Sequence, residues 1–434
     1  MKSRKYFFIC NFKFQISSFK IFFLALFIFN ASFLISSAQD STYTRNVIYS
    51  LTSEFMGGRG YVFNGDKRAA DFIRYEFKHD SLVPLTEKYF QPFSFPVNTF
   101  PKSMSVIIDA KTILFPGKDF IVNPASSGAR GTFDLVWVHD TLLNIDTNNI
   151  KGKVVVLDKS LFISSESKKR LQQWSEESHG AAGIIMLEEK KLTWSVSQQQ
   201  NNFFGLSVLK TKIEDNAKHI NLDIKAKYVQ QHNTQNVVGL LKGEIPDTFL
   251  VFTAHYDHLG WMGKNIYFPG ANDNSSGTSM MLNLAKYYSQ HEHKPKYSML
   301  FIAFAGEEAG LMGSHYYTEN PLKPLSQIKF LMNMDLMGTG DEGMMVVNAT
   351  EFPEQFKTLE KINDEKKYLP KLGQRGKAAN SDHYFFTEKG VPAFFFYTMG
   401  GIAAYHDIYD RPETLPLTKY KEVFHLITDF VSSF

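Results

Sequence analysis

The sequence predicts an α/β protein whose mostly parallel mixed sheet is covered by helices on both faces, with a smaller α/β domain inserted into it. The composition, with 44% apolar and 21% charged residues, is that of a globular protein. Near-continuous apolar runs in the C-terminal half are predicted strands, at 248–254, 298–305, 329–334 and 392–397. Segments of helical periodicity alternate with them, at 275–290, 309–319, 353–367 and 418–432. Apolar strands separated by helices are typical of a parallel sheet buried on both faces.

The first 38 residues have the pattern of a secretory signal peptide. They carry five Lys and Arg residues and no acidic residue, and the apolar run Ile21–Ile35 precedes Ser36-Ser37-Ala38. The alternative is an uncleaved membrane anchor, but fifteen helical residues span only about 22 Å, against a hydrocarbon core of roughly 30 Å. We therefore expect a cleaved leader at 1–38, a secreted or periplasmic protein, and no stable membrane span after cleavage.

Charge and cysteine content exclude several classes of function. The 47 basic and 44 acidic residues give +3, but without the five basic residues of the leader the balance is 42 − 44 = −2. No basic excess remains for binding nucleic acid or an anionic membrane surface. The single cysteine, Cys10, lies in the leader, so disulfides and thiol catalysis are excluded from the cleaved chain.

Two further segments lie between the leader and the C-terminal half. Residues 43–77 show helical spacing on both sides of the Gly-rich turn GGRGYVFNGD, which predicts two helices joined by a loop. A compact alternation follows, with strands at 132–139, 153–158 and 181–187 and a helix at 167–179. This alternation predicts a small separate domain at 109–228, between an N-terminal segment at 39–108 and the main domain at 229–434.

Side chains of metal-binding type gather at the predicted strand ends. Ligands of open α/β sheets bind beyond the carboxyl ends of the strands, and five motifs fall there: HYDHLG (255–260), PGANDNSSG (269–277), GEEAG (306–310), Asp335, and AYHDIYD (404–410). Imidazole and carboxylate suit Zn²⁺ when no thiolate is available. The sequence therefore predicts a zinc site at this edge of the sheet.

This arrangement resembles the secreted co-catalytic di-zinc aminopeptidases, the family of bacterial leucyl aminopeptidase and yeast aminopeptidase Y. The motifs HYD, GANDNSSG, AFAGEEAGLMGS, NMDLMG, SDHYFF and YHDIYD occur in the family's order. The runs IKGKVVVLD and HGAAGIIML look like the protease-associated domain that many members carry as an insertion, which would then be the domain at 109–228. The resemblance implies a zinc peptidase catalytic domain at 229–434 that acts on peptides with a free N-terminus, and an inserted domain that borders the cleft and limits which peptides enter.

The resemblance also implies two zinc ions per chain and the residues that hold them. His255 and Asp335 would bind one zinc, Glu308 and His406 the other, and Asp273 would bridge the two. Three carboxylates against four positive charges leave a formal +1, which favours a bound hydroxide.

Three more residues receive catalytic or orienting roles. The resemblance implies that Glu307 is the general base, which takes a proton from water and passes it to the leaving amine, and that Asp257 orients a ligand. Tyr405, next to His406 in sequence, is our candidate donor to the tetrahedral oxyanion.

Four of the site residues also have a plainer interpretation. His255 could be a core histidine, Glu307 and Glu308 a solvated acidic pair at a helix start, and Asp273 part of a helix cap. Their joint position at one sheet edge favours the metal site.

Several neighbouring residues are predicted to support the site without binding metal. We interpret His258 as a residue behind the ligands or in the pocket wall, and Asp382 and His383 as structural or pocket-lining residues. Arg375 could contact a substrate carboxylate or carbonyl, but we expect it to be solvent-exposed.

Two other functions fit part of the pattern. Carboxypeptidases and glutaminyl cyclases share the scaffold, although a carboxypeptidase needs a positive pocket and no Arg cluster lies near the motifs. The third hypothesis is a catalytically dead binding protein, which the complete set of ligand positions disfavours.

Overall fold

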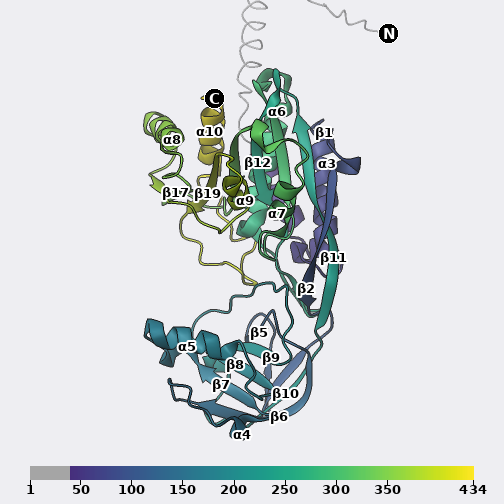
Figure 1. Cartoon of the computed structure of the whole chain (residues 1–434), viewed down its shortest axis with the longest axis vertical. Coiled ribbons are helices and arrows are strands. Elements are labelled where there is room, and N and C mark those ends of the chain that lie inside the picture. Colours follow the sequence, from purple (N-terminus) through teal and green to yellow (C-terminus); the bar gives the residue numbers. More distant parts are fainter. Residues whose placement is uncertain (1–39) are drawn as a thin grey trace, which may run out of the picture. The chain divides into compact units, whose positions relative to one another are not determined.

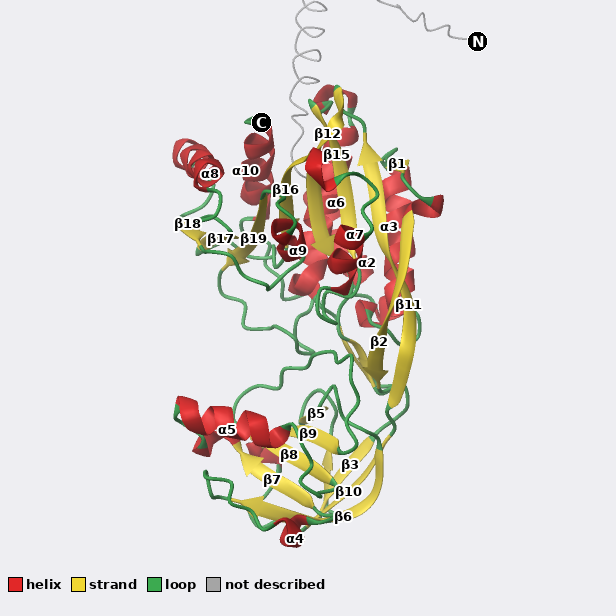
Figure 2. Ribbon diagram, in the orientation of Figure 1, coloured by secondary structure: helices red, strands yellow, loops and turns green. Residues whose placement is uncertain are grey.

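The computed structural model describes residues 40–434, and the predicted leader at 1–38 lies outside the described residues. Within the described range, no helix combines the length and the apolar character needed to cross a membrane. Two large sheets organise this part of the chain (Figures 1 and 2).

The main sheet has the order β1-β11-β15-β12-β16-β19-β17-β18, and β2 pairs with β11. Its strands are β1 (Val83–Pro84), β2 (Phe90–Thr99), β11 (Lys227–Leu241), β12 (Ile245–His255), β15 (Tyr297–Phe304), β16 (Ile328–Met334), β17 (Gly343–Val347), β18 (Leu372–Gln374) and β19 (Ala393–Met399). The central strands β15, β12, β16 and β19 are parallel. The pairings of β11 with β1, β2 and β15, and of β17 with β19, are antiparallel. The edge pair β17–β18 is parallel as well. The predicted mixed sheet is confirmed, with parallel pairing at its centre and at this edge.

Helices cover both faces of this sheet (Figure 1). They are α2 (Ser41–Leu51), α3 (Gly65–His79), α6 (Gly277–Ser289), α7 (Met312–Glu319), α8 (Pro353–Lys366), α9 (His383–Glu388) and α10 (Tyr420–Ser432). Alternate residues of β12 face opposite sides: Leu250 and Phe252 join the core under α2, α3, α6 and α10, whereas Phe249 and Val251 join the core under α7 and α9. This alternation explains why the strand reads as one continuous apolar run.

The second sheet lies within the region predicted as an insertion. Its order is β4-β3-β10-β6-β7-β8-β9-β5, from β3 (Ser105–Ile108), β4 (Thr112–Leu114), β5 (Phe120–Val122), β6 (Ala129–Val138), β7 (Val154–Asp158), β8 (Gly183–Glu188), β9 (Phe204–Leu209) and β10 (His219–Ile224). The predicted helix at 167–179 is α5 (Ser165–Ser175). We call the region 105–224 the second-sheet domain, and its identity as a protease-associated domain stays a prediction.

One antiparallel ribbon links the second-sheet domain to the main sheet. The chain leaves along β2 and returns along β11, and these strands pair from Phe90↔Val237 to Thr99↔Lys227 with one irregularity between Val229 and His232. The sequence did not predict this ribbon as two long strands. The β2 segment FQPFSFPVNT contains two prolines, and the first half of β11 is polar, so neither carries an ordinary strand pattern.

Candidate metal centre

A pocket of about 230 Å³ lies at the carboxyl ends of the central parallel strands. Its lining residues are His255, Asp273, Glu307, Glu308, Asp335, Leu336, Arg375, Asn380, Phe395, Tyr397, Tyr405 and His406. All five predicted metal ligands and the predicted base therefore lie in one pocket, together with Tyr405.

The topology explains how distant residues meet there. His255 is the last residue of β12, Asp335 directly follows β16, and Glu307 and Glu308 follow β15 after a short turn. Because parallel strands end at the same edge of a sheet, these side chains converge. His406 reaches the pocket from the loop after β19, where its backbone has a φ of 54°.

Asp273 lies between the two histidines. Its Oδ1 is 3.4 Å from Nε2 of His255, and its Oδ2 is 3.0 Å from Nε2 of His406. His255 Nε2 is also 3.4 Å from Asp335 Oδ2, and His406 Nε2 is 3.3 Å from Glu308 Oε2. The five side chains thus form two donor sets that share one carboxylate.

The spacing of these donors fits zinc. With zinc–ligand bonds of about 2.0–2.1 Å, the ligand atoms of a tetrahedron lie about 3.3 Å apart, and the donor pairs here are 3.0–3.4 Å apart. The second oxygen of Asp335, Oδ1, is buried and has no hydrogen-bond partner within the described part of the chain. Such an oxygen is available to a cation.

Backbone carbonyls orient both imidazole rings. His255 Nδ1 lies 3.2 Å from the carbonyl oxygen of Asp257, and His406 Nδ1 lies 3.0 Å from that of Trp194. A carbonyl can only accept a hydrogen bond, so each Nδ1 carries a proton and each Nε2 faces the pocket. Nε2 is then the ring atom that a metal ion could bind once it has lost its own proton.

The electrostatics of the pocket favour a cation. Burial raises the pKa of Glu307 well above its usual range, and burial also raises that of Asp335. Burial opposes ionisation of Asp273 as well, but its hydrogen bond with His406 and the charges of the histidines around it lower its pKa. Several carboxyl groups in one buried pocket repel one another when ionised, and divalent cations remove that repulsion.

Asp257 supports the turn that carries Glu307 and Glu308. Its carboxylate accepts hydrogen bonds from the backbone N–H groups of Glu307 at 3.2 Å and Glu308 at 3.3 Å. The hydroxyl of Tyr61 donates to the same carboxylate at 2.5 Å. The carboxylate Oδ1 is 3.8 Å from His255 Nδ1, beyond hydrogen-bond distance, so Asp257 reaches that ring through its carbonyl.

Arg59, in the Gly-rich turn after α2, is a supporting residue that the sequence did not reveal. It is fully buried, and its five N–H donors bond to the carbonyl oxygens of Tyr256, Leu51, Pro269, Gly270 and Asp273 at 2.7–3.1 Å. Burial lowers its pKa to about 10, so it stays charged at neutral pH. Arg59 therefore fixes the backbone of Asp273 and of the residues that precede it.

Asp410 holds the same loop from the opposite side. Its carboxylate accepts from the backbone N–H groups of Asn272 at 2.8 Å and Asp273 at 3.0 Å. The motif YHDIYD contained this residue, but nothing in the sequence indicated that its partners would be backbone amides more than a hundred residues away.

Of the remaining predicted residues, some are buried and do not line the pocket, and the others line it. His258 is buried behind Glu308, with its Nδ1 2.6 Å from Glu308 Oε1. Arg375 is exposed and lines the pocket, where it donates to the hydroxyl of Tyr397 at 2.9 Å. Asp382 and His383 are buried, and neither is among the lining residues of the pocket. Tyr405 is 44% exposed, and its ring stacks on that of His406 with centroids 4.0 Å apart.

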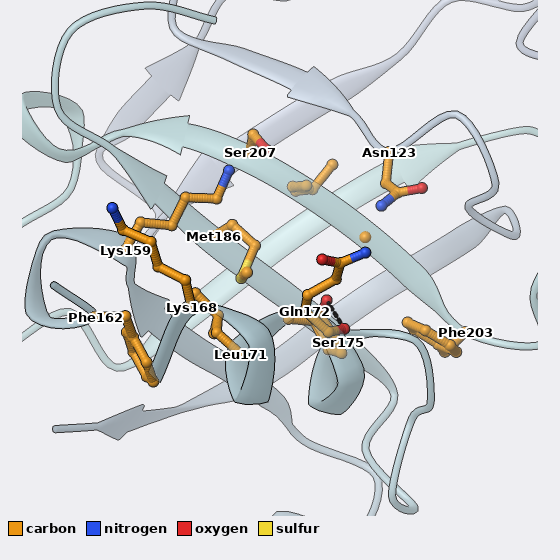
Figure 3. A pocket seen from close by; sticks show the side chains of 13 residues that line it. Asn123, Lys159, Phe162, Lys168, Leu171, Gln172, Ser175, Met186, Phe203 and Ser207 are labelled. Carbon is orange, nitrogen blue, oxygen red and sulfur yellow. Dashed lines mark hydrogen bonds between the residues drawn. The ribbon is translucent and has the colours of Figure 1, made fainter. Parts of the chain in front are cut away.

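A larger cavity of about 420 Å³ lies in the second-sheet domain (Figure 3). Its walls are largely apolar, from Phe162, Leu171, Ile184, Phe203 and Leu206, with Lys159 and Lys168 among the polar lining. No histidine or carboxylate is among its described lining residues. Of these two pockets, only the smaller one is lined by histidine and carboxylate side chains.

Known proteins are similar to this chain in sequence and in fold. Residues 236–431 match Peptidase family M28, which confirms the resemblance for the segment that contains all five predicted ligands. Aminopeptidase YwaD of Bacillus subtilis is 29% identical over 261 residues, covering 56% of this chain and 53% of that protein. Aminopeptidase Y of Saccharomyces cerevisiae is 27% identical over 237 residues, covering 48% and 41%. The chain thus spans about half the length of these curated relatives.

Solved structures share the fold over a longer range. BSAP, a zinc aminopeptidase from Bacillus subtilis, superposes with a TM-score of 0.70 at 21% identity, covering 91% of this chain and 95% of that one. A Peptidase M28 precursor from Shewanella amazonensis gives a TM-score of 0.69 at 15% identity, covering 92% and 95%. The predicted fold class is confirmed.

Proposed function

We propose that this chain is a secreted zinc aminopeptidase that holds two zinc ions and removes N-terminal residues from peptides. The observation that carries the proposal is the position of Asp273, whose two carboxylate oxygens face the Nε2 atoms of two different histidines. A carboxylate so placed can bridge two cations and reduce their mutual repulsion. The zinc aminopeptidases among the matched proteins support the choice of metal and of reaction.

The residues divide between the two ions. Asp335 and His255 would hold one zinc, Glu308 and His406 the other, with Asp273 shared. Bound zinc supplies a Lewis acid and lowers the pKa of water from about 15.7 towards roughly 7. The chain supplies the fixed donors and a buried pocket around them.

Glu307 is the proposed general base. It lines the pocket next to Glu308, and the hydrogen bonds of Asp257 to both backbone N–H groups fix the turn that presents it. Its carboxylate takes the proton of the attacking water and returns it to the amine of the departing peptide. Tyr405, which also lines the pocket, donates its hydroxyl proton in a hydrogen bond to the oxyanion.

Carboxypeptidase activity is the second candidate, because Arg375 is the one Lys or Arg side chain among the described lining residues. A single exposed guanidinium can bind a substrate carboxylate. The aminopeptidases among the matched proteins favour the first candidate, and the carboxylates of the pocket complement a free amino terminus.

Two measurements test the proposal. Metal analysis of the purified chain should give two zinc ions, and aminoacyl-anilides should be hydrolysed while N-blocked peptides are not. Fewer than one zinc per chain would contradict the metal centre, and hydrolysis of blocked peptides alone would contradict the aminopeptidase assignment.

Secretion rests on the leader pattern alone. Expression of the full sequence in a bacterial host should give a protein outside the cytoplasm whose N-terminus is Gln39. Retention of residues 1–38 in the exported protein would contradict cleavage.

A further inference from the structure

The connection between β8 and β9 runs without helix or strand from Glu189 to Phe203, and its first part ends at Gln200 (Figure 2). We call residues 189–200 the strap. It belongs to the second-sheet domain in sequence, yet three of its residues hydrogen-bond to the two loops that carry His406 and Glu308. None of the described residues lining the catalytic pocket comes from the strap, so contact with substrate in that pocket does not account for these bonds.

The central attachment is a pair of hydrogen bonds between Trp194 and His406. The N–H of Trp194 donates to the carbonyl of His406 at 2.9 Å, and Nδ1 of His406 donates to the carbonyl of Trp194 at 3.0 Å. The first bond fixes the backbone of His406, which has a positive φ. The second fixes its ring.

The side chain of Trp194 is itself anchored. It is 5% exposed, its ring stacks on Phe268 with centroids 4.8 Å apart, and its Nε1 donates to the carbonyl of Val122 at 2.8 Å. The carbonyl that holds the His406 ring is therefore part of a rigid packing arrangement.

Two more residues tie the strap to the catalytic loops. Lys191 donates to the carbonyl of Ala403 at 2.7 Å and lies 3.1 Å from the carboxylate of Asp407, on either side of His406. Gln198 donates to the carbonyl of Ala309 at 2.6 Å, directly after Glu308. The strap thus spans the two loops whose side chains form one donor set.

We propose that the strap is a positioning element through which the second-sheet domain sets the zinc ligand His406. The carbonyl of Trp194 holds the ring in the tautomer and orientation that turn Nε2 towards Asp273 and Glu308. This inference rests on the proposed two-zinc function and adds to it: the domain expected only to border the cleft also positions one ligand of the metal centre. Partners of this kind behind a metal ligand typically change metal affinity by about 10–100-fold when they are lost.

The test is zinc affinity measured on the full chain, by competition with a chromophoric chelator after zinc is removed. Lys191→Met with Gln198→Ala removes two anchors at residues that are not buried, so this double variant should fold. We expect one of the two zinc sites to weaken by about 10-fold and the other to stay unchanged. Trp194→Ala should weaken the same site by up to about 100-fold.

The matched control is Lys190→Met with Gln199→Ala, which changes the same residue types at exposed positions of the strap. It should bind both zinc ions as the unchanged chain does. If the folded Lys191→Met, Gln198→Ala variant binds zinc at both sites with unchanged affinity, the strap proposal is overturned. If Trp194→Ala does not fold, the Lys191→Met, Gln198→Ala variant decides the test alone. If the unchanged chain binds fewer than two zinc ions, the two-zinc function fails instead.

Discussion

Replacing Arg59 by lysine tests whether the buried guanidinium holds the loop that carries Asp273. Arg59 donates five hydrogen bonds to five carbonyl oxygens, and lysine has three donors. At least two of these bonds are therefore lost in Arg59→Lys, and because the carbonyl of Gly270 also accepts from Ser275, one or two carbonyls lose their donor. An unsatisfied buried polar group costs about 1–3 kcal/mol, so the loss should be about 1–6 kcal/mol, out of the about 5–15 kcal/mol that stabilises an ordinary protein.

Equilibrium unfolding in urea, followed by circular dichroism, measures this change. The control is Arg130→Lys, because Arg130 is an exposed residue whose guanidinium lies 3.6 Å from a carboxylate oxygen of Asp223. That control should stay within about 0.5 kcal/mol of the unchanged chain. If Arg59→Lys also stays within that range and keeps its zinc, the five bonds do not support the loop and the reasoning is wrong.

Three further changes address the chemistry and the pH dependence. Glu307→Gln should lower kcat by about 10²–10⁴-fold with the zinc content unchanged, and full activity in steady-state assays would contradict its role as base. Tyr405→Phe should lower kcat by about 10²-fold with little change in KM; an effect on KM alone would show that the hydroxyl binds substrate rather than the oxyanion. Burial lowers the pKa of His383 from 6.5 to about 3, so this histidine takes up its proton at a higher pH in the unfolded chain than in the folded chain. The free energy of unfolding should therefore fall as the pH drops from about 6.5 towards 3, by up to about 1.4 kcal/mol per pH unit. His383→Leu should flatten that slope in urea unfolding between pH 4 and 7, and an unchanged slope would show that His383 is not its source.

The central strands and their terminal side chains could be predicted because their signals are local. The predicted runs at 298–305 and 329–334 are β15 and β16 within one residue at each end, since a strand buried on both faces is apolar throughout. Parallel strands end together, so the acids and histidines that follow them could be placed in one cluster from the amino-acid sequence alone.

The supporting residues could not be predicted in the same way. Arg59, Asp410 and Trp194 bind backbone groups far away in sequence, and a backbone carbonyl or amide carries no residue signature. The antiparallel outer strands were missed for a related reason: β2 and β11 pair only through the fold, and their own sequences are interrupted by prolines and polar residues.

The ribbon of β2 and β11 also offers a place at which the residues between Thr99 and Lys227 could be deleted. Its last pair, Thr99 and Lys227, brings the two chain crossings side by side, so a two-residue Asn-Gly turn could join them as a hairpin. Such a truncated chain would keep every strand of the main sheet and all five proposed zinc ligands. It would also have to orient His406 without the backbone carbonyl of Trp194.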